Sequence, residues 1–113
     1  MKIITESLSI HNLREMAARS FGDMVKGVVD VDRQCVAVDA ELHSDLEAGL
    51  LDDGSRQSSL WGINFYPDSP GEGFVEFDSM INIRPSQNNR SRMVEDETMR
   101  GRILDIVAKR IAP

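Results

Sequence analysis

Arg84, Arg90 and Arg92 lie in a segment, residues 81–92, that contains no acidic residue and is rich in Asn and Ser, although the chain carries a net charge of -6. Arginine presents several N–H donors in one plane, and with amide and hydroxyl groups it suits recognition of a carboxylate or phosphate. We therefore expect these arginines and Asn89 to bind an anion. The alternative is intramolecular, because residues 39–53 hold six acids and neither Lys nor Arg, and would supply partners for the arginines.

A second polar set comes from the alternation of residues 60–66 and 74–84, which predicts a β-hairpin with one apolar and one polar face. Trp61, Ile63, Phe65, Val75, Phe77, Ile81 and Ile83 form the apolar set. The polar face comprises Asn64, Tyr66, Glu76, Asp78, Asn82 and Arg84, and all of these except Glu76 are candidate ligand-binding residues. Because Asn is infrequent in strands, Asn64 and Asn82 indicate a ligand-binding face, with Asp78 orienting an arginine. An ordinary solvated face of an antiparallel sheet is the alternative.

A third candidate lies at Glu41, His43 and Asp45. A histidine beside a carboxylate can act as a general base near neutral pH, or as a ligand of a divalent metal. The spacing matches no zinc signature, so we predict no metal site from it. The alternative is a helix start in which Ser44 or Asp45 is the cap and His43 bonds to a local acceptor.

The elements that must position these groups follow from turn and capping residues. Residues 3–4 predict a short strand, 28–31 and 35–38 a hairpin, and 60–66 and 74–84 a second hairpin. Helices are expected over 10–20, where Ser9 is the cap and Gly22 the stop, over 43–53, and over 95–111. The order β-α-β-β-α-β-β-α predicts an α+β fold: a mostly antiparallel sheet of two hairpins plus a short N-terminal strand, with three helices on one face. The opposite face is then free for a site.

Length and composition limit the classes of protein. The 113 residues predict a single domain, 1–113, and 41% hydrophobic with 28% charged residues is typical of a globular chain.

Nineteen acids against thirteen basic residues argue against nucleic acid as a partner. No apolar run reaches the ~20 residues of a membrane span, and the start lacks a signal-peptide pattern. With one cysteine, Cys35, in a Val- and Ala-rich run, we expect a buried thiol and a cytoplasmic location. No phosphate-loop or dinucleotide pattern is present, so no cofactor is predicted.

Four segments together resemble a known family: residues 21–26 (FGDMVK), 41–43 (ELH), 61–67 (WGINFYP) and 81–92. The chain is similar over essentially its whole length to a family of small prokaryotic proteins known only as a domain of unknown function. The resemblance implies a stand-alone domain. It implies no activity, and no catalytic residue can be transferred from the family to this chain.

Two functional hypotheses and one structural alternative follow. The first is a binding domain for a small anionic ligand or an acidic segment, with the arginines supplying charge and the asparagines fixing orientation. The second is a hydrolase-like enzyme in which His43 acts with Glu41 or Asp45, and it requires His43 to lie near Arg84 or Arg90. The structural alternative is a homodimer in which the acidic and arginine-rich segments meet.

Overall fold

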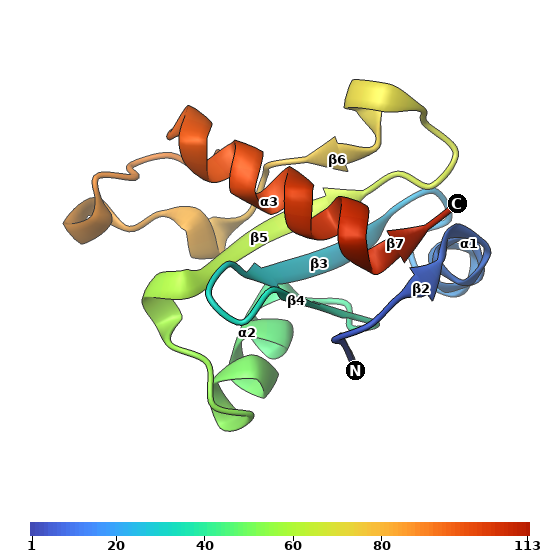
Figure 1. Cartoon of the computed structure of the whole chain (residues 1–113), viewed down its shortest axis with the longest axis horizontal. Coiled ribbons are helices and arrows are strands. Elements are labelled where there is room, and N and C mark those ends of the chain that lie inside the picture. Colours follow the sequence, from blue (N-terminus) through green and yellow to red (C-terminus); the bar gives the residue numbers. More distant parts are fainter.

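The computed structural model describes residues 1–113 and contains a five-stranded sheet with the strand order β1-β4-β3-β5-β6 (Figure 1). Every neighbouring pair in this sheet is antiparallel. Its strands are β1 (Lys2–Ile4), β3 (Val25–Asp30), β4 (Cys35–Val38), β5 (Leu60–Phe65) and β6 (Val75–Glu76). A separate parallel pair joins β2 (Leu8–Ser9) to β7 (Ile111–Ala112), so the last residues of the chain lie beside the segment that leads into α1. The expected α+β class is confirmed.

Three helices form where local signals place them: α1 (Ile10–Arg19), α2 (His43–Asp52) and α3 (Glu97–Arg110). The Ser9 side chain accepts a hydrogen bond from the backbone N–H of Asn12 and caps α1. Beyond its end, Gly22 has a φ of 93° and donates its N–H to the Ala17 carbonyl at 2.7 Å, as the sequence predicts. No helix combines the length and apolar character needed to cross a membrane.

The helices cover both faces of the sheet, so the expectation that they share one face is wrong. On one face, α1 and α3 pack against alternate residues of β3 and β5, including Ile63 and Phe65. In Figure 1, α3 lies across this face. On the other face, Leu46 and Leu50 of α2 pack against Val28 and neighbouring residues of β4 and β5. Because α2 is short, it covers this face only in part, and the uncovered part carries the site described below.

The second hairpin is the largest departure from the predicted elements. The expected strand over 74–84 ends at Glu76 and is followed by two short 3₁₀ helices, η3 (Met80–Asn82) and η4 (Pro85–Gln87). The Asn82 side chain replaces the missing strand: its Oδ1 accepts from the Gly62 N–H at 2.8 Å, and its Nδ2 donates to the Gly62 carbonyl at 3.0 Å. Asn82 is therefore fully buried, whereas Ile83, expected in the core, is 40% exposed.

Candidate functional site

A polar cleft of about 530 Å³ lies where the start of α2 meets β3, β5, β6 and η3. Its lining combines charged, amide and hydroxyl side chains with an apolar rim. The lining residues are Met24, Lys26, Leu42, His43, Ser44, Asn64, Tyr66, Glu76, Asp78, Ser79, Met80, Ile81 and Arg92. Five of these were expected from the sequence to form a site, namely His43, Asn64, Tyr66, Asp78 and Arg92. The cleft thus joins residues that the sequence assigned to three separate candidates.

The floor of the cleft is a row of side chains across three strands. Lys26 on β3 lies opposite Asn64 on β5, and Asn64 lies opposite Glu76 on β6. Directly opposite residues of antiparallel strands project from the same face of the sheet. The Asn64 Nδ2 donates to Glu76 Oε1 at 2.9 Å and to the Asp78 carbonyl at 3.1 Å, and the Tyr66 hydroxyl donates to the same Glu76 oxygen at 3.1 Å. Burial and the adjacent Glu76 carboxylate raise the pKa of Tyr66.

Two groups in this row have no partner in the protein. The Oδ1 of Asn64 is buried and accepts no hydrogen bond, and the residue as a whole is only 5% exposed. Burial lowers the pKa of His43 and the Asn64 side chain opposes this lowering, as a nearby acceptor would, but with neutral His43 the Oδ1 has no donor. The Lys26 ammonium makes no ion pair; it lies 5.1 Å from the centroid of the Phe21 ring. Because burying an amide oxygen without a donor is unfavourable, both groups are available to a bound molecule.

His43 is held at the edge of the cleft by one hydrogen bond to the sheet. Its Nε2 lies 2.8 Å from the Ile63 carbonyl oxygen. A carbonyl can only accept, so Nε2 carries the proton, and the neutral imidazole then has its lone pair on Nδ1. Burial lowers the pKa of His43 below 6.5, against the opposing effect of the Ile63 carbonyl. The side chain is therefore a neutral base at neutral pH.

The carboxylates expected beside His43 lie elsewhere. Glu41 lines a separate hollow with Asp39, and Asp45 does not line the cleft. The carboxylates that share the cleft with His43 are Glu76 and Asp78. No group of three or more His, Cys, Asp or Glu side chains is arranged to hold a metal ion. The alternative in which Ser44 or Asp45 caps the helix is wrong, because both residues lie inside α2. The N-cap position is Leu42, whose side chain makes no capping hydrogen bond.

The three arginines have three different environments. Arg84 is 9% exposed, lies 3.4 Å from Glu47 and stacks 5.0 Å from the Trp61 ring. Since Glu47 belongs to the acidic segment 39–53, the intramolecular alternative is correct for this arginine. Arg92 donates its Nε to Asp78 at 2.7 Å in the cleft. The Arg90 side chain is exposed and makes no hydrogen bond, although its backbone N–H donates to a Glu95 oxygen.

Asn82 and Asn89 use their amides to build the loop. Asn89 is 3% exposed, and its Nδ2 donates to the carbonyls of Asn82 and Met93 at 2.7 Å each. Its Oδ1 accepts from the Glu95 N–H at 2.9 Å. With these bonds made, neither amide faces the cleft. Of the polar residues expected on the first strand of the hairpin, Asn64 on β5 and Tyr66, which directly follows β5, both line the cleft.

The family comparison covers nearly the whole chain. A family model described as "Protein of unknown function (DUF5674)" matches residues 2–110. The chain belongs to this family. The matched range of DUF5674 includes all three helices, the five-stranded sheet and every residue of the cleft, which confirms the resemblance noted from the sequence. Comparison with curated proteins and with solved structures gave no match.

Two charged residues of the cleft in this DUF5674 chain, Lys26 and Glu76, were not predicted from the sequence as site residues. Lys26 belongs to an apolar run with no motif around it, and Glu76 looks like an ordinary polar strand residue. The signal that unites them is the pairing of β5 with both neighbouring strands, which places each opposite Asn64. Local sequence patterns do not contain that register.

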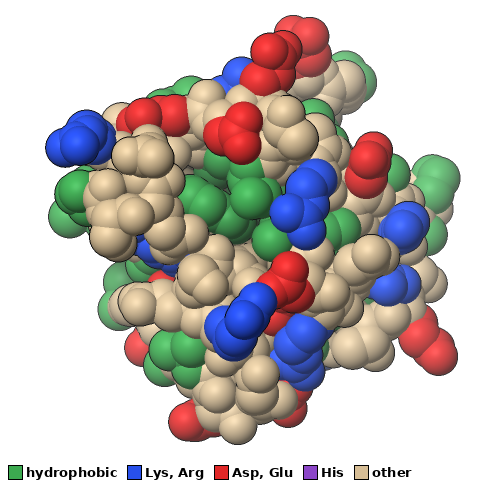
Figure 2. All heavy atoms as spheres, turned by 60° about the vertical axis from the view of Figure 1, so that its left-hand side comes forward, with side chains coloured by type: hydrophobic (Ala, Val, Ile, Leu, Met, Phe, Trp, Pro, Cys, Tyr) green, Lys and Arg blue, Asp and Glu red, His purple; other side chains and the backbone are tan.

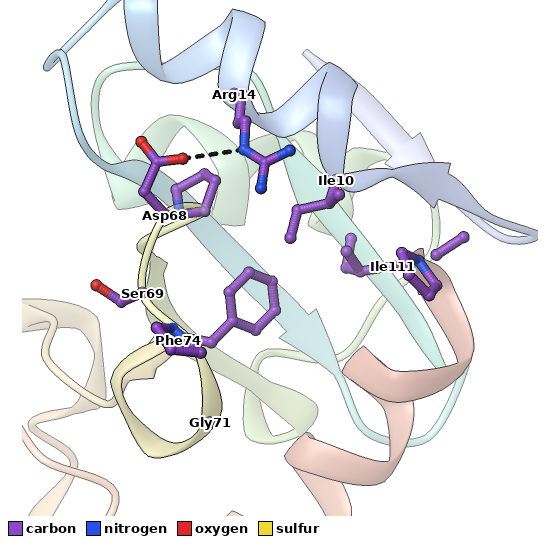
Figure 3. Close-up of a pocket in the computed structure, with 11 residues that line it drawn as sticks. Ile10, Arg14, Asp68, Ser69, Gly71, Phe74 and Ile111 are labelled. Atoms are coloured by element: carbon purple, nitrogen blue, oxygen red, sulfur yellow. Dashed lines mark hydrogen bonds and ion pairs between the residues drawn. The ribbon is translucent and has the colours of Figure 1, made fainter.

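A second hollow, of about 480 Å³, lies between α1, the loop before β6 and the C-terminus. Figure 3 shows Ile10, Phe74 and Ile111 around it, with Arg14 donating its Nε to Asp68 at 2.9 Å on the rim. This ion pair is exposed, and none of the site residues expected from the sequence lies here. The hollow is mainly apolar and brings together fewer polar groups than the cleft does.

Charged side chains are mixed over the surface. On the face drawn in Figure 2, Lys and Arg side chains lie beside Asp and Glu side chains and form no continuous basic area. Ion pairs account for part of this mixture: Arg56 lies 2.9 Å from Asp32, and Arg33 pairs with Asp53. Much of the positive charge is therefore matched locally within the chain.

Proposed function

We propose that this domain binds a small polar ligand through an acidic group, and that the polar cleft is the binding site. The observation that carries the proposal is the pairing of Lys26, whose ammonium makes no ion pair, directly opposite Asn64, whose buried Oδ1 accepts no hydrogen bond. Arg92, the other cation in the cleft, is held by Asp78. Lys26 is thus the cation that a carboxylate or phosphate can reach without breaking an ion pair; the contact with the Phe21 ring is the one interaction of its ammonium.

The shape of the cleft supports a small molecule. A volume of about 530 Å³ lies within the ~300–1,000 Å³ typical of ligand sites. Leu42 and Met80 are 53% and 66% exposed at its rim, so an apolar part of the ligand has a surface to contact. Polar groups on the floor and apolar groups at the mouth are the usual division in such sites.

A thermal-shift screen of carboxylates, sugar phosphates, nucleotides and divalent metals tests this function. A ligand selective for the folded state stabilises it by about 2.7 kcal/mol at one hundred times its Kd. The stabilisation should disappear in Lys26→Met and persist in Lys2→Met, which removes a lysine from the exposed edge of β1. Equal stabilisation of both variants would show that the acidic group binds outside the cleft.

A hydrolase-like activity is the second candidate. The residues expected to act with His43 do not line the cleft, namely Glu41, Asp45, Arg84 and Arg90. The activity would therefore depend on the orientation of His43 itself. With Nε2–H bound to the Ile63 carbonyl, Nδ1 is free to accept a proton from a nucleophile or water. Turnover of aryl ester, phosphoester or amide substrates would be measured for the wild type, His43→Gln and His11→Gln. The activity should be lost in His43→Gln alone, and activity surviving there would exclude this role.

The cytoplasm is the proposed location. Cys35 is the one cysteine of the chain and is buried and unpaired. Since no disulfide stabilises the fold, nothing in it needs an oxidising compartment.

A further inference from the structure

We propose that the ligand of the cleft is a zwitterion of dipeptide size, with its ammonium group at Glu76 and its carboxylate at Lys26. This inference rests on the binding function proposed above and names the class of ligand. It follows from the order of charges along the floor: a cation on β3, an amide on β5 and a carboxylate on β6.

The spacing of the row sets the separation of charges in the ligand. Neighbouring strands lie about 4.8 Å apart, so the backbones at Lys26 and Glu76 are separated by about 10 Å. Their side chains can lean inward over Asn64 and shorten this distance. The charges of a free α-amino acid are too close together to reach both ends, whereas one peptide unit separates them further.

The Glu76 end of the cleft is rich in acceptors. One Glu76 oxygen accepts from Asn64 and Tyr66, and the other has no partner. Asp78 likewise uses one oxygen for Arg92 and leaves the other unpaired. An ammonium group has three donors and no acceptor, so it suits this end. The same two carboxylates repel a ligand with several negative charges, such as a phosphate dianion.

The centre of the row calls for a donor in the ligand. The buried Asn64 Oδ1 accepts nothing from the protein, and the neutral His43 offers a second acceptor at Nδ1. A peptide N–H between the two charged ends can donate to Asn64. A plain ω-amino acid of similar length has charges at the same separation but no donor between them.

Calorimetry with alanyl-alanine and four analogues tests the ammonium group, the carboxylate, the central N–H and the separation of the charges in turn. N-acetyl-alanyl-alanine lacks the ammonium group, alanyl-alanine amide lacks the carboxylate, 5-aminopentanoate has the same number of bonds between its charges but lacks the central N–H, and alanine has its charges too close together. Since a hydrogen bond to a charged group contributes about a tenfold change or more, the analogues that lack a charge or misplace it should bind at least about tenfold more weakly than alanyl-alanine. The ω-amino acid loses a bond between neutral groups and should bind about two- to tenfold more weakly.

Matched variants locate the two ends. Glu76→Gln keeps an oxygen for Asn64 and Tyr66 and should weaken alanyl-alanine about tenfold, while leaving N-acetyl-alanyl-alanine unchanged. Lys26→Met should weaken alanyl-alanine but not its amide. The controls are Glu72→Gln, in the exposed loop before β6, and Lys2→Met, and both should bind as the wild type does. Thermal melts of each variant show that it is folded.

The outcomes separate this inference from the proposed function. If N-acetyl-alanyl-alanine binds as tightly as alanyl-alanine, or if another acid binds through Lys26 while no dipeptide does, the zwitterion is wrong and the acid-binding function stands. If 5-aminopentanoate binds as tightly as alanyl-alanine, the role of the central N–H is wrong. If no acid of any class binds, both proposals fall.

Discussion

The Nε2–H of His43 donates to the Ile63 carbonyl at 2.8 Å and ties the first residue of α2 to the middle of β5. The two residues are twenty positions apart in the chain. This one bond fixes the orientation of the imidazole and leaves Nδ1 unprotonated in the neutral form. It also brings a titratable group to the edge of the row formed by Lys26, Asn64 and Glu76.

Stability should depend on pH through His43. Burial lowers its pKa in the folded state below the ordinary value of 6.5, so the unfolded chain binds the proton more tightly. The contribution is therefore intact above pH 6.5 and is lost as the pH falls from there through the lower folded-state value. Each unit of lowering corresponds to about 1.4 kcal/mol. Urea unfolding between pH 8 and pH 5 measures the slope.

His43→Gln should flatten that slope between pH 6.5 and the folded-state value, because the buried imidazole is gone. His11→Gln is the matched control, since His11 is exposed on α1 and pairs with Glu15 at 2.9 Å. An unchanged slope in His43→Gln would assign the pH dependence to another group.

Two glycines should respond to alanine with opposite signs. A Cβ at Gly62 would meet the Ser79 side chain at 2.4 Å, so Gly62→Ala should displace η3 and destabilise the fold by about 1–3 kcal/mol. A Cβ at Gly101, within α3, meets nothing within 4 Å, so Gly101→Ala should stabilise by about 0.5–1 kcal/mol. Chemical denaturation measures both; destabilisation by Gly101→Ala would contradict the open space around that residue.

Asn82→Ala should destabilise the fold severely. It removes the side chain that satisfies both backbone groups of Gly62 and donates to the Arg92 carbonyl at 3.0 Å. Because each buried group left unpaired costs about 1–3 kcal/mol, we expect a loss of about 3 kcal/mol or more. Asn12→Ala, on α1 where the side chain makes no hydrogen bond, should change the free energy of unfolding by less than about 0.5 kcal/mol. Similar losses in both variants would argue against the strand-like role of Asn82.

Arg84→Ala and Arg90→Ala should separate a structural arginine from an exposed one. Removing Arg84 leaves Glu47, 16% exposed at its side chain, without its cation and uncovers Trp61, so we expect a loss of about 3 kcal/mol. The exposed Arg90 side chain should contribute less than about 0.5 kcal/mol. The difference in melting temperature checks this. If Arg84→Ala left the melting temperature unchanged, the pair of Arg84 with Glu47 would contribute nothing to stability.

Helices and their ends were predictable because the forces that form them act within a few residues. The cap at Ser9, the stop at Gly22 and the last helix, expected over 95–111 and observed as α3, are local features that the sequence predicted. The hairpin of β3 and β4 follows from two β-branched runs around a short turn. The prediction that the strand continues from Glu76 to Arg84 was wrong. The side chain of Asn82, and not a strand backbone, bonds to Gly62 of β5, and the alternation of apolar and polar residues cannot indicate this.

The sequence by itself determined the α+β class, the three helices, the buried Cys35 and the membership of DUF5674. It also named His43 and Asn64 as chemically capable, but it assigned them to separate sites. Tertiary structure alone decided that they share one cleft, that Lys26 and Glu76 lie on either side of Asn64, and that Arg84 is buried against Glu47. Strand register and buried hydrogen bonds join residues far apart in the chain, so no local pattern contains them.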